Sequence, residues 1–167
     1  MNIRLADEQD IPPILELISF IVKNMNKNGI NIWNPSYPAI THISSDIKEQ
    51  HLYILEESEE KEIVGIAALK NQQPIEYETV SNFKKTKFKL IKRLCIHPKV
   101  QKQGYGKKIV EFLEDKSKNL GFDSIRLDTW SDLKNVKVHS FYEKMGYEKK
   151  EELEMEGEYF FVYEKVL

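Results

Sequence analysis

The stretch from residue 88 to residue 120 carries a strand, a glycine-bearing turn and a helix in close succession. Apolar residues recur at nearly every second position over 88–96, and this alternation predicts a β-strand. Pro98 has no amide proton, so strand pairing ends before it. From Gly104 onward the apolar residues follow one stripe of a helix, and Gly121 stands where a left-handed cap would end that helix.

The turn between this strand and this helix has the features of an anion site. A helix start leaves N–H groups without partners and carries the positive end of the helix dipole. Glycines at 104 and 106 remove the Cβ atoms that would keep a ligand from the backbone, and Lys102, Lys107 and Lys108 add positive charge. The turn therefore predicts a phosphate or pyrophosphate site, with a plain strand–helix connection as the alternative. The spacing fits neither the dinucleotide pattern nor the Walker pattern.

Length and composition favour one ordinary globular domain. The chain has 167 residues and a formal net charge of −2, so its charge gives no case for nucleic-acid binding. Cys95 is the only cysteine; a buried structural role is expected for it, and a reducing compartment for the protein. No apolar run approaches the roughly 20 residues that cross a bilayer, and no signal-peptide pattern is seen. We expect a single cytoplasmic domain over residues 1–167 that binds no membrane.

Periodicity and turn residues along the chain give the order β-α-α-β-β-β-α-β-α-β-β. Two prolines forbid regular structure over 30–40, where Trp33 and Tyr37 predict either a packed loop or a lid over an acceptor substrate. Residues 70–87 have little periodicity and predict a long loop that either shapes a pocket or is mobile. A charged turn is expected over 56–61, and a turn over 153–157 between the last two strands.

Two segments resemble the GNAT superfamily of N-acetyltransferases. The first is Gln101-x-x-Gly104-x-Gly106 after the strand, and the second is Asn135 followed seven residues later by Tyr142, with Gly146 and Tyr147 leading into the next strand. The element order is also that of this family, so the resemblance covers essentially the whole chain. It implies an α+β fold, a three-layer α/β arrangement with a mixed, mostly antiparallel central sheet of six to seven strands and about four helices.

The resemblance also implies acetyl-CoA as co-substrate and assigns residues to it. In the family the strand over 88–96 and the strand over 123–129 splay apart, and the pantetheine arm lies in the gap. Backbone amides near the end of the first strand would polarise the acyl carbonyl, the turn would hold the pyrophosphate, and Asn135 would contact pantetheine. The implied acetyl-CoA-binding residues are Leu94, Cys95, Ile96, Gln101, Lys102, Gln103, Gly104, Tyr105, Gly106, Lys107 and Asn135.

Acetyl transfer to an amine needs a proton donor for the leaving thiolate and a base for the amine. Tyr142 is the candidate acid, and a core tyrosine is the alternative reading. Many family members carry a glutamate on the central strand, whereas Lys92 and Arg93 stand there in this chain. The base is therefore open between Asp128, a water chain ending on Asp128 or on a loop glutamate, and, less favoured, His97.

The remaining histidines suggest no catalytic role at this stage. His139 is expected on the surface, and no His, Cys or Asp cluster has metal-ligand spacing, so no metal is expected.

The acceptor is the least defined part of the predicted reaction. Trp33 and Tyr37, together with the acidic residues Glu76 and Glu78, favour a cationic small-molecule amine as substrate. A non-catalytic sensor of CoA or acyl-CoA and a protein N-acetyltransferase are the alternatives. Many relatives form homodimers, and the sequence does not show an interface.

Overall fold

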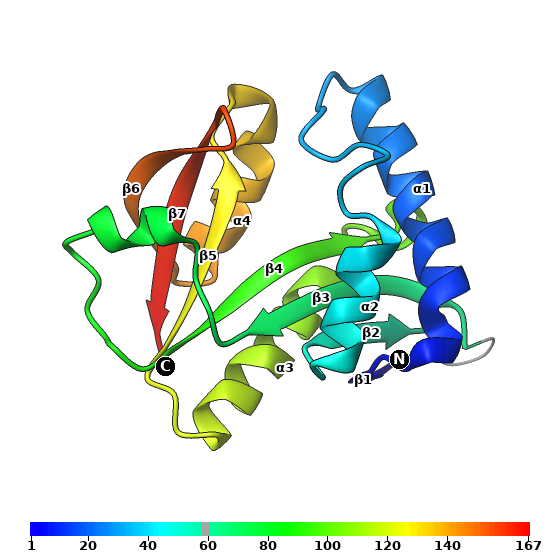
Figure 1. Ribbon diagram of the computed structural model, residues 1–167, viewed down its shortest axis with the longest axis horizontal. Coiled ribbons are helices and arrows are strands. Elements are labelled where there is room, and N and C mark those ends of the chain that lie inside the picture. Colours follow the sequence, from blue (N-terminus) through cyan, green and yellow to red (C-terminus); the bar gives the residue numbers. More distant parts are fainter. Residues whose placement is uncertain (58–60) are drawn as a thin grey trace. The chain divides into compact units, whose positions relative to one another are not determined.

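The computed structural model describes residues 1–57 and 61–167, shown in Figure 1. These residues form a mixed α/β fold with four α-helices and a seven-stranded sheet in the order β1-β2-β3-β4-β5-β7-β6. The predicted fold class and element order are confirmed. The strands are β1 Asn2–Leu5, β2 Leu52–Glu56, β3 Ile63–Lys70, β4 Phe88–Ile96, β5 Ser124–Trp130, β6 Glu148–Met155 and β7 Glu158–Val166. The α-helices are α1 Ile11–Lys27, α2 Ile40–Lys48, α3 Tyr105–Asn119 and α4 Val136–Lys144, and short 3-10 helices are η1 Glu8–Asp10, η2 Ile75–Thr79, η3 Pro98–Val100 and η4 Leu133–Asn135.

Two compact units divide the chain. The first comprises Met1–Leu69 and Arg93–Phe112, and the second comprises Lys70–Lys92 and Leu113–Leu167. Strand β4 and helix α3 contribute residues to both units.

The first unit has helices on both faces of its strands. Ile54 of β2 and Ile66 of β3 share a buried apolar cluster with Ile14 of α1, and α1 and α2 lie over these strands in Figure 1. The opposite face meets α3, where the Tyr53 ring lies 5.7 Å from the Phe112 ring. Strand β2 is buried along its whole length because both faces are covered.

Gly65 explains how two strands of the first unit approach closely. A Cβ placed on Gly65 would lie 2.6 Å from Ile96 Cδ1 and 3.1 Å from the Cys95 carbonyl oxygen. The register between β2 and β3 also shifts next to this glycine, between Leu55 and Glu56. A glycine is needed here because any side chain would displace the strand that leads into the anion turn.

The second unit is built on antiparallel pairing of β7 with β5 and with β6, and on parallel pairing of β4 with β5. The β4–β5 pairing joins Phe88–Ile91 to Ser124–Leu127, while β5 continues to Trp130. Lys92 and Asp128 come next along the two strands, just past the paired segment.

Two expected turns differ in extent from the prediction. Strand β6 reaches Met155, so the turn expected over 153–157 is confined to Glu156 and Gly157. Strand pairing continues there because Leu153 and Met155 pair with Phe160 and Glu158 of β7. The charged turn expected over 56–61 falls partly on residues 58–60, outside the described residues.

No helix of the described residues combines the length and the apolar character of a membrane-spanning segment. Over residues 1–57 and 61–167, no three His, Cys, Asp or Glu side chains gather as a metal site would require.

Candidate active site

The glycine turn of the first unit adopts a backbone that only glycine tolerates well. Gly104 has φ +85°, and the preceding Lys102 also has positive φ, at 62°. An ideal Cβ at Gly104 would meet no atom of the described residues within 4 Å, so the glycine is required by its conformation rather than by crowding. The turn delivers the chain into α3, whose first N–H groups have no partners within the helix. This geometry fits the predicted anion site.

Two glutamine side chains stabilise this turn through hydrogen bonds to nearby main-chain carbonyl groups. The amide of Gln101 donates to the Ile96 carbonyl at 3.0 Å, and the amide of Gln103 donates to the Lys99 carbonyl at 3.2 Å. Lys107, one of the predicted ligand-binding cations, lies 3.5 Å from Glu111 one helical turn on, and this exposed pair is weak. The turn is thus held by its own side chains, and Gly104 stays exposed.

Strand β4 changes conformation immediately before the residues predicted to polarise an acyl carbonyl. Arg93 has φ 54°, the left-handed region that a non-glycine residue adopts at an energetic cost and that bulges use. Its guanidinium is buried and lies 3.1 Å from the fully buried carboxylate of Asp46. The buried ion pair fixes the direction of the Arg93 side chain, and Leu94, Cys95 and Ile96 follow directly. Burial raises the pKa of the Cys95 thiol to about 12, in agreement with the expected structural role.

The loop over residues 30–40 is anchored by both of its aromatic side chains. Trp33 is partly buried and packs against the apolar cluster of the first unit. The Tyr37 ring lies 5.1 Å from the His42 ring and 5.7 Å from the Arg93 guanidinium. These contacts fit the packed-loop alternative, and a role of Trp33 and Tyr37 in substrate binding stays a prediction.

Histidines 97 and 139 both have structural partners. His97 Nδ1 accepts the Lys99 amide at 3.1 Å, and its ring stacks on Phe20 at 4.4 Å. The prediction that His139 lies on the surface is wrong. His139 is buried, its Nε2 donates to the Trp130 carbonyl at 2.6 Å, and its ring packs edge-on against Phe161. One hydrogen bond and one aromatic contact accompany the burial of this ring.

Asp128 in the second unit is the centre of a cluster that joins three elements. Its Oδ2 accepts the hydroxyl of Tyr77 from η2 at 2.7 Å and the ammonium of Lys92 from β4 at 2.7 Å. Tyr77 is almost fully buried, and the Asp128 side chain is 8% exposed. Lys92 of β4 is thus the ion-pair partner of Asp128 on the neighbouring strand, and a role of Asp128 as the base stays a prediction.

Tyr142 of α4 is buried in an aromatic environment of the same unit. Its ring lies 5.0 Å from Phe141, 5.5 Å from Tyr147 and 6.4 Å from Tyr163. Burial raises the pKa of Tyr142 well above its ordinary value, and the negative charge of Asp128 raises it further. The phenol is therefore protonated at neutral pH, as a proton donor must be.

The side chain of Asn135 hydrogen-bonds to the last residue of β5. Its side-chain amide donates to the Trp130 carbonyl at 2.9 Å, the same oxygen that His139 contacts. The amide group of Asn135 is thereby fixed in orientation, and its contact with pantetheine stays a prediction.

Comparison with known proteins decides the family. The model of the Acetyltransferase (GNAT) family matches residues 20–147. The chain belongs to the GNAT acetyltransferase family. Its members are acetyl-CoA-dependent acyltransferases, and this assignment is consistent with the braced glycine turn and the buried tyrosine.

Solved structures of GNAT proteins have the same fold. A GNAT-family acetyltransferase from Streptococcus agalactiae is 22% identical with a TM-score of 0.82, over 99% of this chain and 95% of that chain. A GNAT-family acetyltransferase from Listeria monocytogenes is 17% identical with a TM-score of 0.79, over 99% and 94%. N-acetylglutamate synthase from Neisseria gonorrhoeae, complexed with coenzyme A and N-acetyl-glutamate, is 20% identical with a TM-score of 0.70, over 99% of this chain and 35% of that chain. No curated protein sequence is significantly similar to this GNAT chain.

Two members of the Asp128 cluster were missed as site residues at the sequence level. Tyr77 lies in a segment without periodicity, and the sequence shows Lys92 only as a departure from the family pattern. The one usable signal was Lys92 itself, because a lysine inside an otherwise apolar strand requires a buried partner.

Proposed function

We propose that this GNAT domain transfers the acetyl group of acetyl-CoA to the amine of a small molecule by direct attack in a ternary complex. The observation that carries the proposal is that one unit of this GNAT domain buries both the Tyr142 phenol and the Asp128 carboxylate. One group suits proton donation and the other suits proton acceptance, which are the two proton transfers that the reaction requires.

Residues of the first unit would bind acetyl-CoA. The turn from Gln101 to Lys107 would hold the pyrophosphate through backbone N–H groups at the start of α3, and Gly104 leaves that backbone open. Leu94, Cys95 and Ile96 would supply main-chain groups to the acyl end. Acetyl-CoA, when bound, supplies the acetyl carbonyl carbon to which the amine nitrogen bonds as the carbon–sulfur bond breaks.

The side chains of the second unit would move the protons. Asp128 accepts the proton that the amine nitrogen loses, either directly or through a water molecule. Tyr142 donates its hydroxyl proton to the departing sulfur, which leaves as the free thiol of CoA. Solvent then returns a proton to Tyr142 and takes one from Asp128, so that the enzyme ends in its starting state.

Calorimetric titration with acetyl-CoA and a thiol-release assay over a panel of small amines test this function together. We expect saturable binding and thiol release that depends on both the protein and an amine. An absence of acetyl-CoA binding would contradict the proposal. Binding of CoA without thiol release over a broad panel would instead favour a sensor, and release with peptides alone would favour a protein N-acetyltransferase.

A further inference from the structure

We propose that Tyr77 is a positioning residue for Asp128, and that the 70–87 segment is a folded arm that presents the Tyr77 hydroxyl to this carboxylate. The inference rests on the proposed function, because it takes Asp128 as the group that receives the proton of the amine. It gives the 70–87 segment, which the sequence predicted only as a long loop, a role in orienting Asp128.

The contact between Tyr77 and Asp128 is buried and specific. The Tyr77 hydroxyl donates to Asp128 Oδ2 at 2.7 Å, although 51 residues separate the two in sequence. Tyr77 is 1% exposed, and its ring lies 5.9 Å from Phe83 of the same segment. A buried phenol needs a partner for its hydroxyl, and a carboxylate gives the stronger, charge-assisted hydrogen bond.

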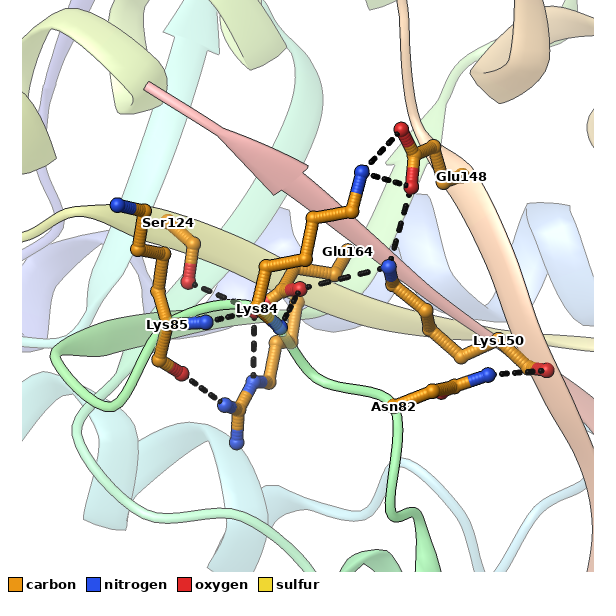
Figure 2. A network of polar contacts seen from close by, with 8 residues as sticks. Asn82, Lys84, Lys85, Ser124, Glu148, Lys150 and Glu164 are labelled. Atoms are coloured by element: carbon orange, nitrogen blue, oxygen red, sulfur yellow. Dashed lines mark hydrogen bonds and ion pairs between the residues drawn. The ribbon is translucent and has the colours of Figure 1, made fainter.

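A network of polar contacts around Glu164, which we call the clamp, holds the C-terminal end of the 70–87 segment, as Figure 2 shows. Glu164 of β7 is 1% exposed and accepts the backbone amide of Lys84 at 2.7 Å and the hydroxyl of Ser124 at 3.2 Å. Lys150 lies 3.6 Å from the same carboxylate and also contacts Glu148 at 3.1 Å. The segment is thus fixed to the sheet through its main chain, which is independent of its side-chain sequence.

Arg126 of β5 completes the attachment at two further points. Its guanidinium donates to the side-chain carbonyl of Gln73 and to the main-chain carbonyl of Lys85, both at 2.5 Å. It also lies between two rings, 3.6 Å from the centre of Phe83 and 4.0 Å from that of Phe88. Both ends of the segment are therefore tied to one buried arginine, and Tyr77 lies between these ties.

The charged and titratable groups around Asp128 come from three of the four elements that face it. Tyr77 comes from η2, Lys92 from β4 and Tyr142 from α4, while β7 pairs with it through the apolar Val162. Tyr77 and Lys92 both donate to Oδ2, so together they fix the direction of the carboxylate. Donors also favour the ionised form, which is the form that can accept a proton from the amine.

The test is Tyr77→Phe, which keeps the buried ring and removes one hydroxyl. We expect kcat/KM to fall roughly tenfold, the usual size of a lost hydrogen bond to a charged group, with the dissociation constant of acetyl-CoA unchanged. The pH–rate profile of Tyr77→Phe should differ from that of wild type, because Asp128 loses one of the two donors on its Oδ2. Tyr159→Phe is the matched control, since this tyrosine of β7 is 54% exposed and its hydroxyl lies 3.4 Å from Glu154.

A readout that needs no turnover separates this inference from the proposed function. The carboxyl carbon of Asp128, labelled with carbon-13 and assigned with Asp128→Asn, is titrated by NMR in wild type, Tyr77→Phe and Tyr159→Phe. A higher titration midpoint in Tyr77→Phe alone supports the inference, and equal midpoints overturn it. If wild type releases no thiol with any amine, the proposed function fails while this titration still decides the contact. A shifted midpoint with an unshifted pH–rate profile overturns the positioning role.

Discussion

The glycine turn is formed by residues that are close in sequence, whereas the Asp128 cluster is formed by residues that are far apart in sequence. The turn is local: its glycines, glutamines and lysines lie within residues 101–108, its side chains bond to nearby carbonyls, and its backbone is exposed. The cluster is assembled from distant residues, because the contacts of Asp128 with Lys92 and Tyr77 span 36 and 51 positions, and its side chains are largely buried. The proposed ligand-binding turn is therefore encoded in a short motif, whereas the proposed proton-transfer cluster depends on contacts between distant residues.

Lys92 and Arg93 are adjacent in β4 but have their ion-pair partners in different units. Arg93 pairs with Asp46 inside the first unit, and Lys92 pairs with Asp128 inside the second. Both cations stand in the strand where many GNAT members carry a glutamate, and both are neutralised by carboxylates from other elements. The strand here supplies positive partners and receives its carboxylates from neighbouring elements.

The largest expected effect separates proton transfer from binding. Tyr142→Phe should lower kcat by roughly 10²-fold or more, since it removes the proposed acid and keeps the aromatic ring. The dissociation constant of acetyl-CoA, measured by calorimetry, should remain that of the wild type, and Tyr159→Phe should change neither quantity. Equal losses in turnover and in binding would show that Tyr142 serves the fold of the pocket rather than proton donation.

A large effect on stability is expected where the clamp of the second unit is broken. Glu164→Gln leaves Arg126 and Lys150 without their buried carboxylate, and breaking such a pair costs about 3 kcal/mol of unfolding free energy. Urea unfolding measures this loss. Glu148→Gln is the matched control, because Glu148 contacts Lys84 and Lys150 from an exposed position and should change stability little. Similar losses in the two variants would remove the distinction between buried and exposed members of the network.

The order of elements could be predicted because hydrophobic periodicity is a local property of the sequence. The glycine turn could be predicted because its glycines and lysines are also close together in the sequence. The cluster could not, because Tyr77 lies in a non-periodic segment and is brought to Asp128 by the ties of Arg126 and Glu164. His139 was misplaced on the surface because its burial depends on the Trp130 carbonyl, a main-chain group that no side-chain pattern reports.

A smaller effect tests whether the glycine turn is a binding element. Gly104→Ala forces a side chain into the left-handed region, at a cost of about 1–2 kcal/mol, without a clash with any atom of the described residues. We expect weaker acetyl-CoA binding, by up to about tenfold if that cost falls on the bound state, with kcat at saturation preserved. Gly157→Ala is the matched control, since Gly157 has φ +81° and equally open surroundings in the turn between β6 and β7. It should lose similar stability and keep its affinity; weaker binding in both variants would refute a specific role for the turn.

The smallest expected effect concerns pH and the exposed edge of the clamp. The ammonium of Lys84, and then that of Lys150, lowers the pKa of Glu148 from its ordinary value of 4.5. A carboxylate whose pKa is lower in the folded state than in the unfolded state adds stability above its ordinary pKa and loses that contribution as pH falls through the folded value. The difference in unfolding free energy between wild type and Glu148→Gln should therefore be small and constant near neutral pH and should shrink below about pH 4. Urea unfolding at neutral and acidic pH measures it, and a difference that grows on acidification would mean that Glu148 is held protonated, in conflict with its two lysine partners.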